Sequence, residues 1–195
     1  MGQQGAVAAV MVPGVRTILP LRALALCLCL VASAAGAQPE VGELQLKAAY
    51  LYRFASFVQW PERAFATSDS PFLIGVAGDD ELADEARQVV AGRGIDGHPF
   101  EVRRVQRGDS LDDLHILFLG ALDRSALAEL LNSARSLALL TVSDSPHAVE
   151  LGSMIRFVAA RERLRFEVAL AQVEPAGLRI SARMLATAAN VTGTP

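Results

Sequence analysis

The side chains best suited to chemistry follow one apolar segment in the last third of the chain. Ser143, Asp144 and His147 are residue types of hydrolase triads, in which a base activates a hydroxyl nucleophile. They lie within a few positions of one another, and the G-x-S-x-G turn that presents a nucleophilic serine is absent. A polar loop after a strand is the simpler interpretation, so we rank a hydrolase that uses Ser143 or His147 last.

A second motif, Gly92 to Gly97, matches the spacing G-x-G-x-x-G of dinucleotide-binding proteins. In those proteins the motif follows a strand and opens a helix, which brings its backbone close to the pyrophosphate. Here it follows a segment of helical periodicity and precedes a segment of alternating hydrophobicity. It therefore predicts a helix stop and a turn, and we expect no cofactor there.

Acidic residues and histidines are the remaining candidates, as ligands of a metal ion. Asp79 and Asp80 stand at the start of a predicted helix, where carboxylates cap N–H groups and interact favourably with the helix dipole. His98, His115 and His147 are scattered, without the spacing of a zinc site. His115 begins an apolar strand and is expected to be a hydrogen-bonded structural residue. We therefore expect no catalytic residue, metal or cofactor.

The first 37 residues have the layout of a secretory signal peptide. Arg16 and Arg22 precede the apolar run Ala23 to Ala32, and Ala35-Gly36-Ala37 supplies an A-x-A cleavage site. The run is far shorter than the ~20 residues that a helix needs to span a bilayer. We predict that the chain is exported and cleaved after Ala37.

Both cysteines, Cys27 and Cys29, lie in this leader, so the mature chain can form neither disulfides nor thiolate metal sites. Leucines precede both cysteines, whereas a lipoprotein signal needs a small residue there, so we expect no lipid anchor. Two alternatives stay open at this end: an uncleaved leader that acts as an anchor, and a start at Met11 instead of Met1.

Removal of 37 of the 195 residues leaves 158, which suffice for one domain with a substantial core. The leader holds two arginines and no acids, so the mature chain has 16 basic and 21 acidic residues. A net-acidic domain without a basic cluster is not expected to bind nucleic acid. No segment of the mature sequence is long and apolar enough to cross a membrane, so none is expected to do so.

Hydrophobic periodicity predicts alternating helices and strands. Helices are expected at 41–58, 81–90, 123–135 and 181–191, strands at 72–77, 100–105, 116–119 and 137–142, and a hairpin at 154–159 and 164–170. Short apolar strands separated by helices imply a mostly parallel sheet that is covered on both faces. The expected fold class is α/β: a single-domain three-layer sandwich over residues 38–195, with a mostly parallel sheet and a C-terminal antiparallel hairpin.

Five of the eleven aromatic residues fall between Tyr50 and Trp60. Trp60 stands before Pro61, which ends the helical pattern because the residue before a proline avoids the α region. We interpret Trp60 mainly as a plug at the helix end within the core. A role as an anchor for a partner is the alternative, because tryptophan is enriched at interface hot spots.

The string K-A-A-Y-L-Y-R-F-A-S-F-V-Q-W-P, from Lys47 to Pro61, resembles the opening motif of the YfiR family. Further similar blocks follow in the family's order and cover nearly the whole mature chain. They are Phe72–Asp80, His115–Leu119, Leu140–Asp144, Met154–Ile155, Phe166–Val168 and Ala176–Ser181. Leu114, Ser153 and Ala169 depart from the pattern, standing where relatives often carry a cysteine, a glycine and an asparagine.

The resemblance implies a periplasmic protein without enzymatic activity. Characterised relatives repress an inner-membrane diguanylate cyclase by holding its periplasmic sensory domain inactive, which lowers cyclic di-GMP and disfavours biofilm. The expected partner is therefore such a cyclase or a sensor kinase in the inner membrane, and the resemblance also suggests a homodimer. The alternative is a periplasmic small-ligand-binding protein, with a crevice at the strand ends lined by 78–80, Gly120 and 143–144.

The expected contact surface for a partner is apolar and includes the loop 143–153 and the hairpin 161–165. The candidate partner-binding residues are Trp60, Ser143, Asp144, His147, Leu151, Met154 and Glu167.

Overall fold

The computed structural model describes residues 39–160 and 163–193, and the structural statements below concern those residues. The predicted leader lies outside them, so export and cleavage after Ala37 stay predictions, as does the role expected of Arg161 and Glu162. Within the described ranges, no helix combines the length and the apolar character needed to span a bilayer.

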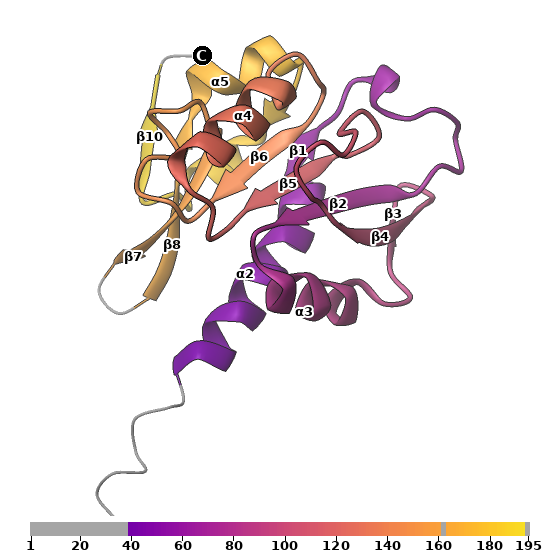
Figure 1. Cartoon of the computed structure of the whole chain (residues 1–195). Coiled ribbons are helices and arrows are strands. Elements are labelled where there is room, and N and C mark those ends of the chain that lie inside the picture. The colour runs from indigo at the N-terminus through magenta and orange to yellow at the C-terminus, as the bar shows by residue number, and fades with distance from the viewer. Residues whose placement is uncertain (1–38, 161–162, 194–195) are drawn as a thin grey trace, which may run out of the picture. The chain divides into compact units, whose positions relative to one another are not determined.

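The domain is built on one mixed sheet flanked by helices (Figure 1). The helices are α2 (Pro39–Phe57), α3 (Asp80–Val90), α4 (Arg124–Ala134), α5 (Leu170–Val173) and α6 (Ala182–Leu185), with 3-10 turns at η1 (Glu62–Ala64) and η2 (Glu174–Ala176). The sheet strands are β2 (Phe72–Ala77), β3 (Gly94–Ile95), β4 (His98–Arg104), β5 (Ile116–Leu119), β6 (Leu140–Ser143), β7 (Ile155–Ala160), β8 (Arg163–Ala169) and β10 (Asn190–Thr192). A separate antiparallel pair joins β1 (Val58–Gln59) to β9 (Arg179–Ile180).

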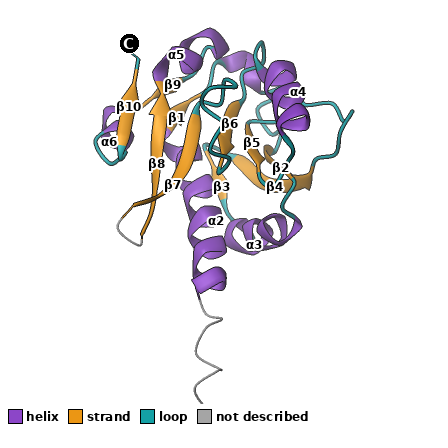
Figure 2. Ribbon diagram, turned by 60° about the vertical axis from the view of Figure 1, so that its left-hand side comes forward, coloured by secondary structure: helices purple, strands orange, loops and turns teal. Residues whose placement is uncertain are grey.

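The eight strands of the large sheet lie in the order β10-β8-β7-β6-β5-β2-β4-β3. The five strands from β7 to β4 in this order run parallel, and β8 returns antiparallel to β7. Figure 2 shows the β7–β8 hairpin beside β6, with β10 beyond β8. The predicted mostly parallel sheet with a C-terminal antiparallel hairpin is therefore confirmed.

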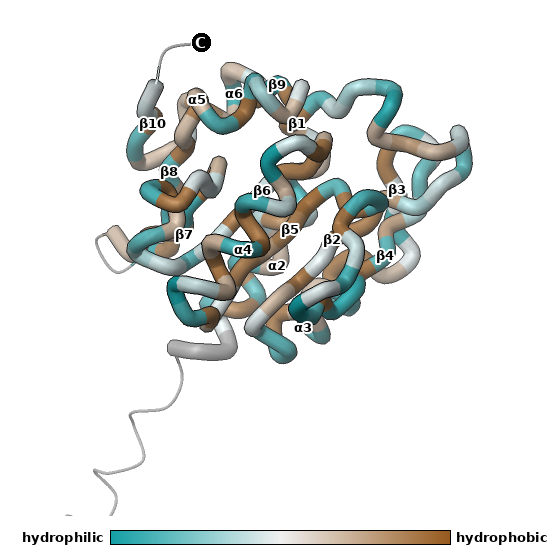
Figure 3. The backbone as a smooth tube through the Cα atoms, turned by 45° about the horizontal axis from the view of Figure 1, so that its top comes forward, coloured by the Kyte–Doolittle hydropathy of each residue, from teal (hydrophilic) through white to brown (hydrophobic). Residues whose placement is uncertain are grey.

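Strand β5 shows how the sheet separates two cores. All four of its residues are buried, and Figure 3 shows the strand as strongly hydrophobic. Because side chains alternate along a strand, Ile116 and Phe118 pack with α2 and α3, whereas Leu117 and Leu119 pack with α4. Helices on both faces explain why β5 is apolar at every position, and they confirm the predicted sandwich.

Side-chain caps fix where the two main connecting helices begin. Asp79 Oδ1 accepts from the N–H of Leu82 at 2.9 Å, as expected for the cap of α3. Asp123 Oδ1 accepts from the N–H groups of Ser125 and Ala126 at 2.8 and 2.9 Å and caps α4. The carboxylate of Asp79 thus caps the N-terminus of α3. Among the described residues there is no group of three or more His, Cys, Asp or Glu side chains that could hold a metal ion.

The helix predicted at 181–191 was wrong in its extent. Ser181 caps α6 by accepting from the N–H of Met184 at 3.3 Å, but the helix ends at Leu185. The chain then turns back to the sheet, where the Ala189 N–H donates to the Phe166 carbonyl at 2.7 Å. Residues 190–192 form β10, parallel to β8, so pairing with the sheet overrides local helix propensity.

Candidate functional site

Two sequence blocks that lie far apart in the chain meet in one ion pair. Lys47 on α2 is only 8% exposed, and its Nζ donates to Asp144 Oδ2 at 2.8 Å. Glu43, one turn earlier on α2, places its Oε1 2.9 Å from the same Nζ. Burial lowers the pKa of Lys47, but hydrogen bonds and charges from Asp144 and Glu43 outweigh it and raise the pKa overall. This ion pair thus joins α2 to the residue that follows the carboxyl end of β6.

The loop after β6 is held from its other side by Arg156 of β7. Arg156 Nη1 donates to the Pro146 carbonyl at 3.0 Å, and its Nη2 donates to Glu167 Oε2 at 2.7 Å. Arg156 and Glu167 face each other in the antiparallel register of β7 and β8, and their side chains are 26% and 25% exposed. Glu167, a candidate for partner contact, is therefore paired within the domain in this conformation.

The side chains that resembled a hydrolase triad do not converge. Ser143 is fully buried, and its Oγ donates to the Leu119 carbonyl at 2.6 Å and accepts from the Ser145 N–H at 3.1 Å. His147 is exposed, with its Nδ1 3.6 Å from Glu150 Oε2. A nucleophile needs a base within hydrogen-bond reach, whereas the hydroxyl of Ser143 ties β6 to β5.

The glycine motif forms the predicted helix stop and turn. Gly92 follows α3 with a φ of 68°, and Gly97 connects β3 to β4 with a φ of 92°. Both values lie in the left-handed region that glycine adopts without steric cost. The motif leads into a strand, so it does not present a helix N-terminus to a phosphate group.

The crevice expected at the carboxyl ends of β2 and β5 is filled by protein at Gly78. The N–H groups of Gly120 and Ala121 donate to the carbonyls at the end of β2, at 2.8 and 3.1 Å. Leu122 covers Gly78, where an added Cβ atom would come within 2.9 Å of the leucine side chain. Open α/β sheets bind ligands at this edge, so Leu122 removes support from the small-ligand alternative at Gly78.

His115 lies within a cluster of aromatic rings. It is 2% exposed, and its Nδ1 accepts from the Leu73 N–H at 3.2 Å. The rings of Phe65 and Phe72 lie 4.4 and 4.6 Å from its ring, measured between centroids. Burial lowers the pKa of His115 to about 4, and the backbone of Ala64 offsets only part of this effect. The expected structural, hydrogen-bonded role is therefore confirmed.

Trp60 packs on the same cluster at the end of α2. It is half-buried, and its ring lies 4.9 Å from that of Phe72 in an edge-to-face arrangement. Its Nε1 is buried and has no hydrogen-bond partner among the described residues. Trp60 therefore fits the plug that we expected at the helix end, and its contact with a partner stays a prediction.

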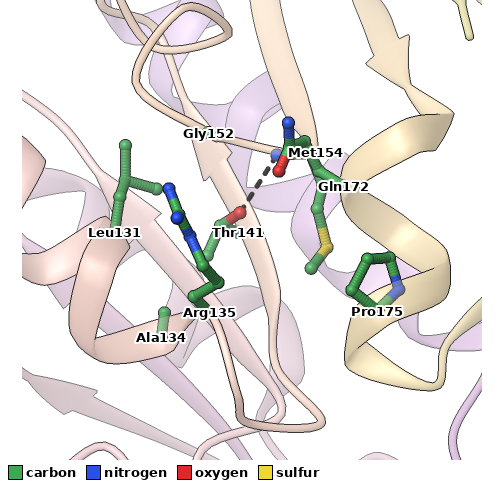
Figure 4. Close-up of a pocket in the computed structure, with 8 residues that line it drawn as sticks. All are labelled: Leu131, Ala134, Arg135, Thr141, Gly152, Met154, Gln172 and Pro175. Atoms are coloured by element: carbon green, nitrogen blue, oxygen red, sulfur yellow. Dashed lines mark hydrogen bonds between the residues drawn. The ribbon is translucent and has the colours of Figure 1, made fainter.

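Met154 and Leu151 belong to the loop that follows β6 and lie near helices α4 and α5. Met154 is 4% exposed, and its N–H donates to Thr141 Oγ1 at 3.0 Å. Its side chain lines a cavity of about 220 Å³, with Arg135 and Gln172 on opposite sides (Figure 4). Leu151 is partly buried against the α4 core. The cavity is small for a ligand site, since such sites usually enclose roughly 300–1,000 Å³.

The seven candidate residues thus divide by their surroundings, and contact with a partner remains untested for all of them. Ser143 and Met154 are buried, and Asp144 and Glu167 are held in ion pairs. His147 is the most accessible of the loop residues among them. The ion pair between Lys47 and Asp144 was not predicted, although both residues belong to sequence blocks that resemble the family.

These features define an α/β sandwich protein whose loop residues are engaged mainly in internal hydrogen bonds and ion pairs. The model of the YfiR/HmsC-like family matches residues 44–189, and the chain belongs to this family. The resemblance drawn from the sequence blocks is thereby confirmed. No curated protein matches the chain significantly. Membership points to a regulatory role related to cyclic di-GMP and not to catalysis.

Proposed function

We propose that the protein is a non-enzymatic periplasmic regulator that binds the periplasmic sensory domain of an inner-membrane signalling protein. More specifically, we propose that the signalling protein is a diguanylate cyclase, which this protein represses, so that cyclic di-GMP falls. The observation that carries the proposal is family membership over residues 44–189. The internal engagement of Ser143 supports it, because the loop that most resembled a catalytic site holds the sheet together.

Repression requires that the protein prefer one conformation of its partner. A ligand shifts a two-state equilibrium only by its difference in affinity for the two states. A preference of about 3 kcal/mol changes the ratio of the states roughly a hundredfold. A well-ordered binding surface favours a preference for one conformation of the partner. The ion pair of Lys47 with Asp144 contributes to such order because it joins α2 to the sheet.

The test compares cyclic di-GMP in a strain that lacks the gene with that in the same strain carrying the gene on a plasmid. We expect deletion to raise cyclic di-GMP and the full-length gene to restore the parental concentration. A matched plasmid that lacks the codons for residues 2–37 keeps the protein in the cytosol and should not restore it. Unchanged cyclic di-GMP after deletion, or full restoration by the leaderless protein, would contradict the proposal.

Thermal denaturation separates this function from small-ligand binding. A ligand that binds only the native state raises the melting temperature as its concentration increases. A metabolite that stabilises the purified domain in this way, while deletion leaves cyclic di-GMP unchanged, would favour the small-ligand alternative.

A further inference from the structure

One side of α2 carries a largely apolar stripe that the domain core covers only in part. Leu46, Tyr50, Arg53 and Phe57 recur at helical spacing beside the core-facing residues of α2. Leu46 and Arg53 are exposed, whereas Tyr50 and Phe57 are half-buried and pack against the rim of the core. Leu46 is 42% exposed and is one of two large apolar residues exposed in the described part of the chain. Apolar side chains that the core covers only in part can add contact area with another protein, so the stripe is a candidate surface for a complex.

A groove lies beside this stripe, between α2 and α6. It encloses about 430 Å³ and crosses β8. Its apolar lining combines buried side chains with the half-buried rings of Tyr50 and Phe57. The buried members are Phe54, Phe166 and Met184. An apolar or aromatic side chain entering the groove would therefore lose its contact with water among aromatic rings, as interface anchors do.

Two exposed arginines, Arg53 and Arg183, are also part of the groove lining, and no acidic residue lines it. In the part of the chain that the structure describes, neither forms an ion pair or a hydrogen bond. The guanidinium of Arg53 lies 5.9 Å from the ring of Phe57. A third arginine, Arg165 of β8, donates to the Thr187 carbonyl beside the groove at 3.0 Å. The groove therefore combines an apolar lining with positive charge that the described acids leave unpaired.

The arginines elsewhere on the domain fall into two groups. Arg103, Arg104 and Arg107 on the opposite edge of the sheet each pair with a carboxylate, whereas Arg93 and Arg179, like the groove arginines, form no ion pair among the described residues. The mature chain carries more acidic than basic residues, so unpaired arginines beside an apolar groove stand out against the average charge. Arginine holds a carboxylate through two parallel hydrogen bonds, and desolvation next to aromatic rings strengthens that contact.

We propose that the groove between α2 and α6 receives a segment of the partner's sensory domain that presents an apolar or aromatic side chain next to a carboxylate. The side chain occupies the groove over Phe166, and Arg53 and Arg183 bind the carboxylate. The inference rests on the proposed function and adds to it the surface and the chemistry of the partner segment. It places the contact on α2, β8 and α6, away from the loop 143–153.

A second copy of this chain fits the groove less well. In a two-fold symmetric dimer the same patch meets itself, so Arg53 and Arg183 of both protomers would be brought into one interface. Like charges brought together in this way oppose association. The charge of the groove therefore favours an acidic partner over self-association.

The test places Arg53→Glu and Arg183→Glu, singly and together, in the deletion strain and measures cyclic di-GMP. The matched control is Arg124→Glu on α4, across the sheet, where the guanidinium of Arg124 is 3.9 Å from its nearest carboxylate. We expect the double variant to leave cyclic di-GMP as high as in the deletion strain, and each single variant to lose at least half of the repression. Arg124→Glu should repress as the wild type does. Melting temperatures of the purified variants and their periplasmic abundance establish that they fold and accumulate.

Four results would overturn the inference. If both arginine variants repress fully while the wild-type gene restores repression, the proposed function stands and the groove is not the contact. If Arg53→Glu changes the sedimentation of the purified protein from that of one oligomeric state to another, the groove is an interface between copies. If phenylacetate raises the melting temperature of the wild type and not of Arg53→Glu, the groove binds free aromatic acids. If deletion itself leaves cyclic di-GMP unchanged, the proposed function fails, and the inference that rests on it fails as well.

Discussion

The Nζ of Lys47 and the Oδ2 of Asp144 lie 2.8 Å apart although 97 positions separate the two residues in the chain. The pair joins the first helix to the end of a central strand. Lys47 is almost fully buried, whereas the side chain of Asp144 is 31% exposed. Loss of Asp144 should therefore cost more stability than loss of Lys47, because it leaves the lysine as a buried charge without its partner, whereas Asp144 can be solvated by water.

Replacement of Asp144 by Asn should lower the free energy of unfolding by about 2 kcal/mol, because it leaves the buried ammonium with Glu43 as its only carboxylate. Glu43→Gln is the matched control, since Glu43 is 56% exposed and its pair with Lys47 spans one helical turn. We expect that control to cost about 0.5 kcal/mol or less. Urea unfolding at pH 7 measures both values, and equal losses would contradict the importance of the long-range pair.

The same pair predicts a loss of stability in alkali. The pKa of Lys47 is raised above its ordinary value of 10.5 in the folded protein. The contribution to stability is therefore fully present below pH 10.5 and decreases as the pH rises through the folded-state pKa. Urea midpoints measured from pH 9 upward should fall less steeply for Lys47→Met than for the wild type, and parallel curves would count against this account.

His115 should make the protein less stable in mild acid. Its pKa falls from 6.5 to about 4 on burial, so the unfolded chain binds the proton first. The contribution of His115 to the free energy of unfolding is therefore fully present above pH 6.5. It decreases as the pH falls to about 4, by about 3 kcal/mol in total.

His115→Asn tests this pH dependence, because its amide oxygen can accept the Leu73 N–H without titrating. The slope of stability against pH between 6.5 and 4 should shrink in this variant. His147→Asn, at an exposed histidine, is the control and should keep the slope of the wild type. An unchanged slope in His115→Asn would show that another group controls the acid response.

Gly75 and Leu114 should be coupled energetically. A Cβ atom added at Gly75 would come within 2.6 Å of Leu114 Cδ1 and 2.9 Å of Val105 Cγ2. Gly75→Ala should therefore lower stability by about 1–3 kcal/mol through overpacking. Leu114→Ala opens space and is costly alone, but the double variant should be more stable than the sum of the single effects predicts. Strictly additive losses in urea unfolding would show that Leu114 does not limit the size of residue 75.

Ser143→Ala should affect stability and not chemistry. The hydroxyl is fully buried and donates to the Leu119 carbonyl at 2.6 Å, so its removal should cost about 1–3 kcal/mol. Thermal denaturation measures the loss, and His147→Ala should leave the midpoint close to that of the wild type. An esterase or phosphatase activity that disappears in Ser143→Ala, with the midpoint preserved, would revive the hydrolase hypothesis.

Local patterns predicted the sandwich because the signals for its elements are short-range. The apolar strand at Phe72–Ala77 and the cap at Asp79 depend on neighbours within a few positions. The glycine motif could also be interpreted locally, since its place after a helix excluded a phosphate loop. These features therefore agree with the structure closely.

Long-range pairing could not be predicted in the same way. The alanine-rich segment after Leu185 has helical composition, yet it leaves the helix because β8 offers the N–H of Ala189 a carbonyl partner. The partner of Asp144 and the closure of Gly78 by Leu122 likewise depend on contacts that no local spacing specifies. For the groove, local periodicity predicted the helix at 41–58, but it could not show that β8 and α6 meet the same side of that helix.

The antiparallel pair of β1 and β9 places Val58 opposite Ile180. The N-terminus of the polypeptide emerges first, both from the ribosome and from a translocation channel. Val58 is therefore available for pairing long before Ile180 is. The rings of Tyr50 and Phe54 likewise lack the ring of Phe166 until β8 has been delivered. Completion of the fold therefore requires the tail of the chain to return to its beginning.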